Sequence, residues 1–132
     1  MSDTPASDIV EHVSSLPFDA TVERLVKAIA DHGMTIFARI DHAANARDVG
    51  MSMPPAMVLI YGNAKGGTPI MLATPLTALD LPLRVLVQER EDGKAVIAFH
   101  PVAAMLRRAG APEDAAVRLE PAQHMLLAAV TP

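Results

Sequence analysis

Polar and conformationally special residues gather in three short segments of this chain, separated by apolar sequence. The first is Arg39–His42, the second is Gly62–Pro69, and the third is Asp80–Arg84. The hydrophobic pattern predicts that each segment joins the end of one element to the start of the next. Binding and catalytic residues concentrate at such junctions. We therefore treat the three segments as candidate sites.

The second segment reads Gly62-Asn63-Ala64-Lys65-Gly66-Gly67-Thr68-Pro69, which is similar in composition to a phosphate-binding loop. Glycines let backbone N–H groups converge on an anion, Lys65 adds positive charge, and a helix starting at Thr68 favours an anion. It is not a Walker A motif, because Lys65 precedes the paired glycines, and it is not a GxGxxG fingerprint. Two interpretations stay open: a small-anion site, or a tight turn that needs Asn63 and glycine for unusual backbone angles.

The first segment places Asp41 beside His42, which suggests an acid–base pair in which Asp41 orients His42 as a general base. Adjacent residues at a helix start point about 100° apart, which disfavours one shared metal ion. The five histidines show no HxH, HxxxH or HExxH spacing, so we expect no metal site. We favour Asp41 as a helix N-cap and His42 as a first-turn residue that faces a cleft or a partner chain.

Hydrophobic periodicity predicts the elements that must position these segments. A helix is expected over 18–33, capped by Asp19 or Thr21, and a strand over 34–40 with alternate residues on one face. Asp41 then opens a short helix, and an apolar run predicts a strand over 57–61. Strands over 83–89 and 95–99 are joined by Asp92-Gly93, a strong hairpin signal.

The remaining elements complete an α+β prediction. A first strand is expected within 9–15, a loop over 62–67, and a short helix from Thr68 toward Ala73. A helix is expected over 101–109, and a helix or strand over 121–130. The hairpin favours a two-layer sandwich, with a largely antiparallel sheet and helices packed on one face. We expect one domain, 1–132, with its core at about 9–100 and a C-terminal extension over 101–132.

Length and composition narrow the class of protein. The chain has 132 residues, of which 51% are hydrophobic and 20% charged, and this excludes an intrinsically disordered chain. The absence of Cys excludes disulfides, Cys-ligated zinc and thiol catalysis. A net charge of −4 and 3% aromatic residues predict no nucleic-acid partner. No apolar run approaches the ~20 residues of a membrane span, and Met1–Asp8 lacks signal-peptide features, so we expect a soluble, cytoplasmic protein.

Three stretches, Ile36–Ala44, Gly62–Met71 and Leu79–Val87, together resemble the DUF302 family in order and spacing. The resemblance implies a compact α+β domain, usually assembled as a homodimer, and it implies no established activity. The chain departs from the family at Ala64, where members commonly carry Pro, and at Gln88, where they carry an aromatic residue. By position, the resemblance points to Asp41, His42, Asn63, Lys65 and Arg84.

Three functions follow from these observations. The leading hypothesis is a cleft between the first two segments that binds a small ligand or anion, lined by Asp41, His42, Asn63, Lys65, Gly66, Gly67, Thr68 and Arg84. The second is a homodimeric interaction module, since a mean hydropathy of +0.27 leaves more apolar surface than a small monomer tolerates. The third is an enzyme that uses the Asp–His pair, and the sequence identifies no cofactor for it. Convergence of Asp41, His42 and Lys65 on one pocket would favour the first or third, and their separation would favour the second.

Overall fold

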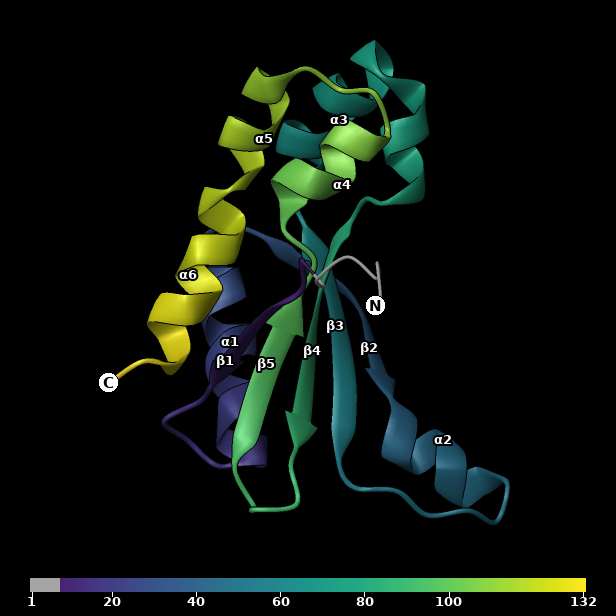
Figure 1. Cartoon of the computed structure of the whole chain (residues 1–132), viewed down its shortest axis with the longest axis vertical. Helices are drawn as coiled ribbons and strands as arrows, with labels where there is room; N and C mark the ends of the chain where they lie inside the picture. The colour runs from purple at the N-terminus through teal and green to yellow at the C-terminus, as the bar shows by residue number, and fades with distance from the viewer. Residues whose placement is uncertain (1–7) are drawn as a thin grey trace, which may run out of the picture.

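A computed structural model describes residues 8–132 as one antiparallel sheet with helices behind it and beyond both of its ends (Figure 1). The strands lie in the order β1-β5-β4-β3-β2, and every neighbouring pair is antiparallel. The strands are β1 (Val10–Val13), β2 (Thr35–Asp41), β3 (Ala56–Gly62), β4 (Leu83–Glu89) and β5 (Ala95–Phe99). The helices are α1 (Phe18–Asp31), α2 (His42–Asp48), α3 (Ala64–Ala73), the 3-10 helix η1 (Pro75–Leu79), α4 (Val102–Arg108), α5 (Glu113–Leu119) and α6 (Pro121–Val130).

The expected α+β class is confirmed, and so is each expected strand. The β4–β5 hairpin turns where the sequence predicts it: Gly93 has a φ of 82°, and the Asp92 carboxylate accepts a hydrogen bond from the Lys94 amide at 3.0 Å. Helix α1 likewise ends before Gly33, whose φ is 74°. Both glycines adopt a left-handed backbone conformation, which glycine reaches without steric cost because it has no Cβ.

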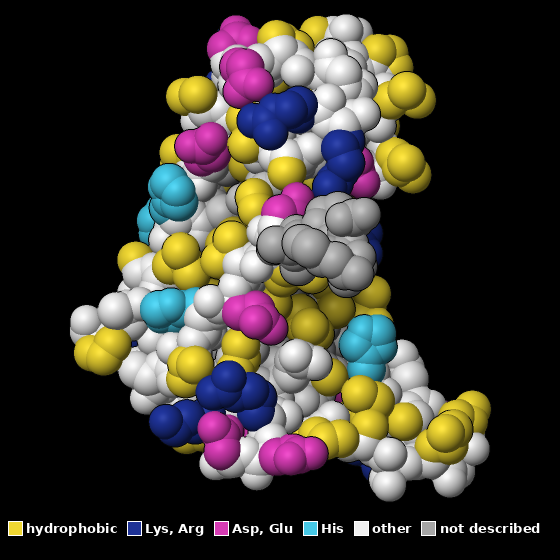
Figure 2. All heavy atoms as spheres, viewed as in Figure 1, with side chains coloured by type: hydrophobic (Ala, Val, Ile, Leu, Met, Phe, Trp, Pro, Cys, Tyr) yellow, Lys and Arg dark blue, Asp and Glu magenta, His cyan; other side chains and the backbone are white. Residues whose placement is uncertain are grey.

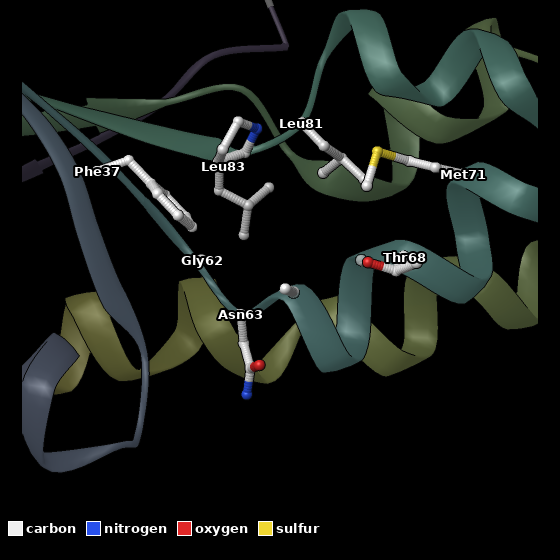
Figure 3. Close-up of a pocket in the computed structure, with 10 residues that line it drawn as sticks. Phe37, Gly62, Asn63, Thr68, Met71, Leu81 and Leu83 are labelled. Carbon is white, nitrogen blue, oxygen red and sulfur yellow. The ribbon is translucent and has the colours of Figure 1, made fainter.

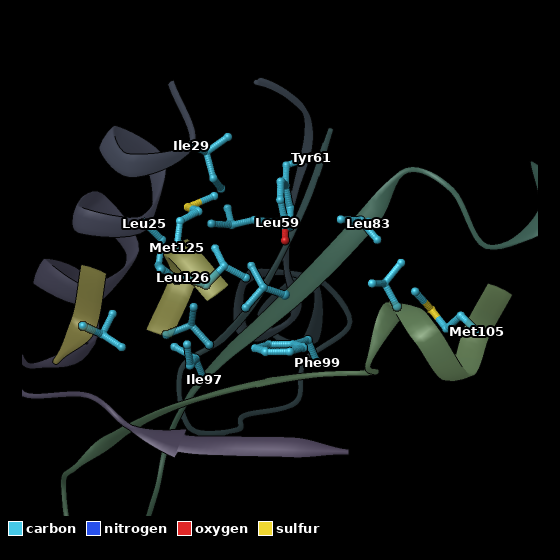
Figure 4. Packing of buried hydrophobic residues seen from close by; sticks show 14 of the residues in the cluster. Leu25, Ile29, Leu59, Tyr61, Leu83, Ile97, Phe99, Met105, Met125 and Leu126 are labelled. Carbon is cyan, nitrogen blue, oxygen red and sulfur yellow. The ribbon is translucent and has the colours of Figure 1, made fainter. Parts of the chain in front are cut away.

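One face of the sheet forms the core. Helices α1 and α6 pack behind it, and Leu25, Ile29, Leu59, Ile97 and Leu126 are completely buried between the two layers (Figure 4). Complete burial of a Leu or Ile side chain stabilises the fold by roughly 1.5–3 kcal/mol. These apolar positions therefore fix which side of each strand faces the helices.

The other side, which we call the open face, includes the cross-strand rows Glu11–Ala98–Leu86–Val58–Ile40 and Arg84–Ile60–Ala38. Side chains of paired residues share one side of a sheet, so these rows point away from α1 and α6. In Figure 1 no described helix lies over the middle of this face. Residues 8–132 thus form two layers, the sheet and the helices behind it, and their helices leave the other surface of the sheet uncovered.

The C-terminal part of the chain shares the same core. Residues 101–132, expected as an extension, contribute Val102, Leu106, Leu126 and Val130, each at most 1% exposed. Two side chains hold this part in place, one from strand β3 and one that contacts the residues just after β5. The Tyr61 hydroxyl donates to the carbonyl of Ala122 at 2.9 Å, and the Gln123 amide bridges the His100 carbonyl and the Val102 amide.

Local predictions fail at three helices for identifiable reasons. Helix α3 begins at Ala64, so the expected loop over 62–67 and the cap at Thr68 are wrong. Glycine costs a helix about 1 kcal/mol per residue, but a cap at Asn63 and burial of Ile70 outweigh it. Helix α5 was not expected at all. The position before α1 is Pro17, and the Thr21 hydroxyl instead donates to the Leu16 carbonyl.

Strand β2 also corrects the predicted faces. A register shift between Ile36 and Ala38 places Phe37 in a bulge. Ile36 pairs with Tyr61 on the core side, whereas Ala38 pairs with Ile60 on the open face. A simple two-residue period puts Ile36 and Ala38 on one face, but an extra residue reverses the alternation beyond it.

Candidate functional site: two capped junctions and a cavity

The Asp41 junction joins β2 to α2. The Asp41 carboxylate accepts a hydrogen bond from the Ala44 amide at 2.9 Å, so the expected N-cap is confirmed. Within the described residues, no hydrogen bond joins Asp41 to His42, and His42 is exposed. The carboxylate is therefore engaged by the backbone of its own helix and does not orient the His42 ring.

The Asn63 junction joins β3 to α3 in the same way. The Asn63 side-chain oxygen accepts from the Lys65 amide at 2.9 Å, and the Asn63 carbonyl accepts from the amides of Gly66 and Gly67, each at 3.0 Å. Neither glycine has a positive φ. The N–H groups expected to cradle an anion thus make ordinary helix-start hydrogen bonds, and Lys65 extends from an exposed position.

These two junctions lie at opposite ends of the β2–β3 hairpin. Thr35 pairs with Gly62 at one end, and Asp41 pairs with Met57 at the other. At about 3.4 Å per strand residue, the ends are about 17 Å apart. Asp41 and His42 therefore share no cleft with Asn63 and Lys65, and Figure 1 shows α2 and α3 at opposite ends of the molecule.

Arg84, the remaining predicted site residue, lies on the open face. It lines a shallow hollow of about 140 Å³ together with Val58, Leu86, Ala98 and other residues. In the part of the chain that the structure describes, neither the Arg84 side chain nor the Glu11 side chain has a hydrogen-bond or ion-pair partner. Figure 2 views this face and shows hydrophobic side chains in a recess over the middle strands.

A larger cavity of about 280 Å³ opens beside the first turns of α3. We call it the Phe37 cavity. Phe37, Met71, Leu81 and Leu83 point toward a common space, while the Asn63 amide turns away from it (Figure 3). The other lining residues are Gly62, Asn63, Ala64, Gly67, Thr68 and Pro82. Of the predicted site residues, only Asn63, Gly67 and Thr68 line this cavity.

Sequence reasoning missed the apolar wall of the Phe37 cavity. One signal was available: Phe37 falls between Thr35 and Arg39, on the face of the predicted strand that otherwise carries polar residues. It is 53% exposed. The third polar segment also contributes here, but through the apolar Leu81 and Pro82 rather than through Asp80 or Arg84.

Tyr61 is a titratable residue of the buried core. Burial raises the pKa of Tyr61 well above its usual range, because the phenolate would lose its hydration. This hydroxyl faces α6, not the cavity. Among residues 8–132, no cluster of His, Asp or Glu side chains is placed to hold a metal ion. In the same residues, every helix is too short or too polar to cross a bilayer.

Comparisons with known proteins agree on family and fold. A family model described as "Domain of unknown function DUF302" matches residues 10–130. A crystal structure of an uncharacterised conserved DUF302 protein from Bacillus stearothermophilus superposes with a TM-score of 0.80. That alignment covers 95% of this chain and 97% of the other at 15% sequence identity, so it supports the fold alone.

The chain is also similar to parts of longer proteins. It is 34% identical over 100 residues to proteins named Fluoride-specific ion channel FluC 1 in Brucella suis and Brucella abortus. The match covers 74% of this chain but only 39% and 37% of those two proteins. The chain therefore spans less than two fifths of the length of these relatives.

Proposed function

The chain belongs to the DUF302 family, whose function is unknown, and from this premise we propose that it is a self-associating module. Two copies pack through their open faces as a homodimer. The observation that carries this proposal is the apolar row Ala98–Leu86–Val58–Ile40, which no described helix covers. The separation of Asp41 and His42 from Lys65 supports a role in assembly over an acid–base enzyme.

Charge on the open face supports a second copy as the occupant. Glu11 and Arg84 flank the apolar row, and neither side chain has a hydrogen-bond or ion-pair partner in the described chain. A two-fold axis that lies in the interface and passes midway between them brings each Arg84 opposite the partner's Glu11. The self-complementary surface of a two-fold dimer requires such reciprocal contacts. The hollow beside Leu86 is large enough to receive one side chain of the partner.

Charge reversal tests this arrangement. Wild-type protein at micromolar concentration is expected to scatter light as twice the 14.0 kDa chain mass. Arg84→Glu and Glu11→Arg should each weaken the dimer about tenfold or more, because like charges then face each other. The double variant should restore it. Arg118→Glu, an exposed reversal on α5, is the matched control and should have no effect.

Leu86→Asp places a charge in the middle of the row and should give monomers with an unchanged circular dichroism spectrum. A wild-type monomer at tens of micromolar would refute the proposal. So would a double charge-swap variant that associates no better than the single ones.

A second candidate function is small-ligand binding, which the Phe37 cavity favours. The anion version of that hypothesis loses its support, because the amides of Lys65, Gly66 and Gly67 already donate to Asn63. The proposed location remains the cytoplasm, and fractionation of cells that express the chain would test it.

The similarity to proteins named as fluoride channels gives a specific anion to try. Fluoride is a strong hydrogen-bond acceptor and needs N–H or cationic donors. Because the N–H groups at the α3 start are engaged, we expect sodium fluoride to raise the Tm no more than sodium chloride at equal concentration. A saturable increase specific to fluoride would instead connect this domain to the anion that those relatives' name specifies.

A further inference from the structure

Hydrophobic side chains converge on the Phe37 cavity from three separate parts of the chain. Phe37 comes from β2, Met71 from α3, and Leu81 and Leu83 from the segment that enters β4. Leu83 is 3% exposed, so the floor of the cavity is continuous with the buried core. An isolated exposed apolar residue needs no explanation, but a concave apolar wall does.

Two features of the backbone keep this space open. The bulge in β2 turns Phe37 out of the regular alternation and toward the end of β3. Glycine stands at two wall positions: a Cβ at Gly62 would lie 3.6 Å from Pro82 Cβ and 3.8 Å from Phe37 Cε2. A Cβ at Gly67 would lie 3.9 Å from Leu81 Cδ1 and from Met71 Cε. A larger side chain at Gly67 would therefore grow into the cavity.

The wall chemistry selects a class of ligand. No charged side chain of residues 8–132 lines the cavity, and its polar side chains are Asn63 and Thr68. The Asn63 oxygen is already used as a helix cap. A charged ligand would lose hydration here without a compensating partner, which costs several kcal/mol. A neutral, largely apolar molecule loses little and gains contact with an aromatic ring and a thioether.

Size narrows the class further. A dry protein cavity of about 150 Å³ can hold benzene. The Phe37 cavity, at about 280 Å³, has room for a molecule with one or two fused rings, or a short branched hydrocarbon with one polar group. That polar group can reach the exposed Thr68 hydroxyl at the rim.

We propose that the Phe37 cavity is a binding site for a small neutral apolar molecule, of about the size of indole. Gly67 provides the space, and Phe37 provides the aromatic wall. This develops the second candidate function above and is independent of self-association, because the cavity and the open face use different residues.

Indole is a suitable probe because the chain contains no Trp, so indole fluorescence reports only the ligand. Equilibrium dialysis against the full chain should give saturable one-to-one binding, with a Kd on the order of 0.1–1 mM for a ligand of so few atoms. The anionic analogue indole-3-acetate should bind at least about tenfold more weakly, since its carboxylate finds no partner.

Adjacent glycines supply a matched pair of variants. Gly67→Ala and Gly66→Ala both replace a helical glycine, and both should raise the Tm slightly. Only Gly67→Ala adds a methyl group to the cavity, because the Cβ at Gly66 would face Leu119 Cδ2 at 3.8 Å. Gly67→Ala should weaken indole binding several-fold and Gly67→Leu should abolish it, while Gly66→Ala leaves it unchanged.

Phe37→Ala removes the aromatic wall and should weaken binding about tenfold, the loss of one aromatic contact. Val49→Ala, at another exposed apolar position, is its control. Leu86→Asp, which disrupts the proposed dimer, should bind indole like the wild type, so the two proposals can fail separately. No saturable indole binding, tighter binding of indole-3-acetate, or wild-type affinity in Gly67→Leu would each overturn the proposal. If Gly67→Leu does not fold, Gly67→Ala and Phe37→Ala decide the question.

Discussion

The β2–β3 hairpin has a strand-to-helix junction at each end, and the two junctions are alike in local chemistry but not in surroundings. Asp41 caps α2 through the Ala44 amide, and Asn63 caps α3 through the Lys65 amide. Helix α2 buries only Ala43. Helix α3 is anchored by Ile70, packs beside α5 and η1, and forms one wall of a cavity.

This comparison shows that a polar residue between a strand and a helix predicts a cap more securely than a site. Asp and Asn side chains commonly accept hydrogen bonds from the free N–H groups in the first turn of a helix, whether or not a site is nearby. A cavity requires side chains from several separate segments, and among residues 8–132 such side chains meet at the Asn63 end. The two ends should therefore respond alike to changes in their caps and differently to changes in packing.

The largest difference is expected from truncation of packed side chains. Ile70→Ala in α3 should lower the free energy of unfolding by about 2–5 kcal/mol, because Ile70 is 4% exposed and leaves a cavity. Val49→Ala, next to α2 and 72% exposed, should change it by less than about 0.5 kcal/mol. Urea denaturation measures both. Equal effects would show that the two ends are packed alike.

Removal of the caps should give closely similar results at the two ends. Asp41→Ala and Asn63→Ala are each expected to lower the free energy of unfolding by about 0.5–2 kcal/mol. Because the junctions are about 17 Å apart, the double variant should equal the sum of the single ones within about 0.5 kcal/mol. Thermal or urea unfolding of the four proteins tests this. A markedly non-additive double variant would mean that the ends are coupled, contrary to the geometry.

Tyr61, next to the Asn63 junction, allows a pH-dependent test of how firmly this end is held. Tyr61→Phe removes the hydrogen bond to Ala122 and should cost about 0.5–1.5 kcal/mol at neutral pH. Burial raises the pKa of Tyr61, so the folded state keeps its proton where the unfolded chain loses it. The stability contributed by Tyr61 is complete below the ordinary tyrosine pKa of about 10 and declines as pH rises above it.

The wild-type advantage over Tyr61→Phe should accordingly shrink in alkaline solution. The chain has a single Tyr, so phenolate absorbance reports this residue alone and should appear only on unfolding. Phenolate absorbance in the folded protein near the ordinary tyrosine pKa would contradict this prediction. It would mean that the Tyr61 hydroxyl is in solvent and does not hold β3 to α6.

The smallest effect is expected at Lys65, the residue that most suggested an anion site. Lys65→Ala should change the free energy of unfolding by less than about 0.5 kcal/mol, because the side chain is exposed and unpaired within residues 8–132. Indole affinity should change less than twofold. Phosphate and sulfate should raise the Tm of wild type and variant equally. A phosphate effect that disappears in Lys65→Ala would restore the anion hypothesis.

The sequence by itself located the five strands and most of the helices, and it determined the chain's fold class. Period-two alternation and the Asp-Gly turn located the strands and the β4–β5 hairpin, and the apolar spacing located α1, because these signals are local in the chain. Asp41 was recognisable as a cap for the same reason. The resemblance identified the DUF302 family from three short stretches, and the family match over residues 10–130 confirms it.

Tertiary structure alone decided which of the candidate residues meet. The spacing of Asp41 and Asn63 in the sequence does not reveal that an antiparallel hairpin carries them to opposite ends. The bulge at Phe37 depends on pairing with β3, and the cavity depends on Leu81 and Met71 arriving from other elements. Helix α3 includes Gly66 and Gly67 because the Asn63 cap and the burial of Ile70 outweigh the low helix propensity of glycine. Helix and strand propensities act over a few residues, whereas the cavity and the open face arise from contacts between segments that are distant in the chain.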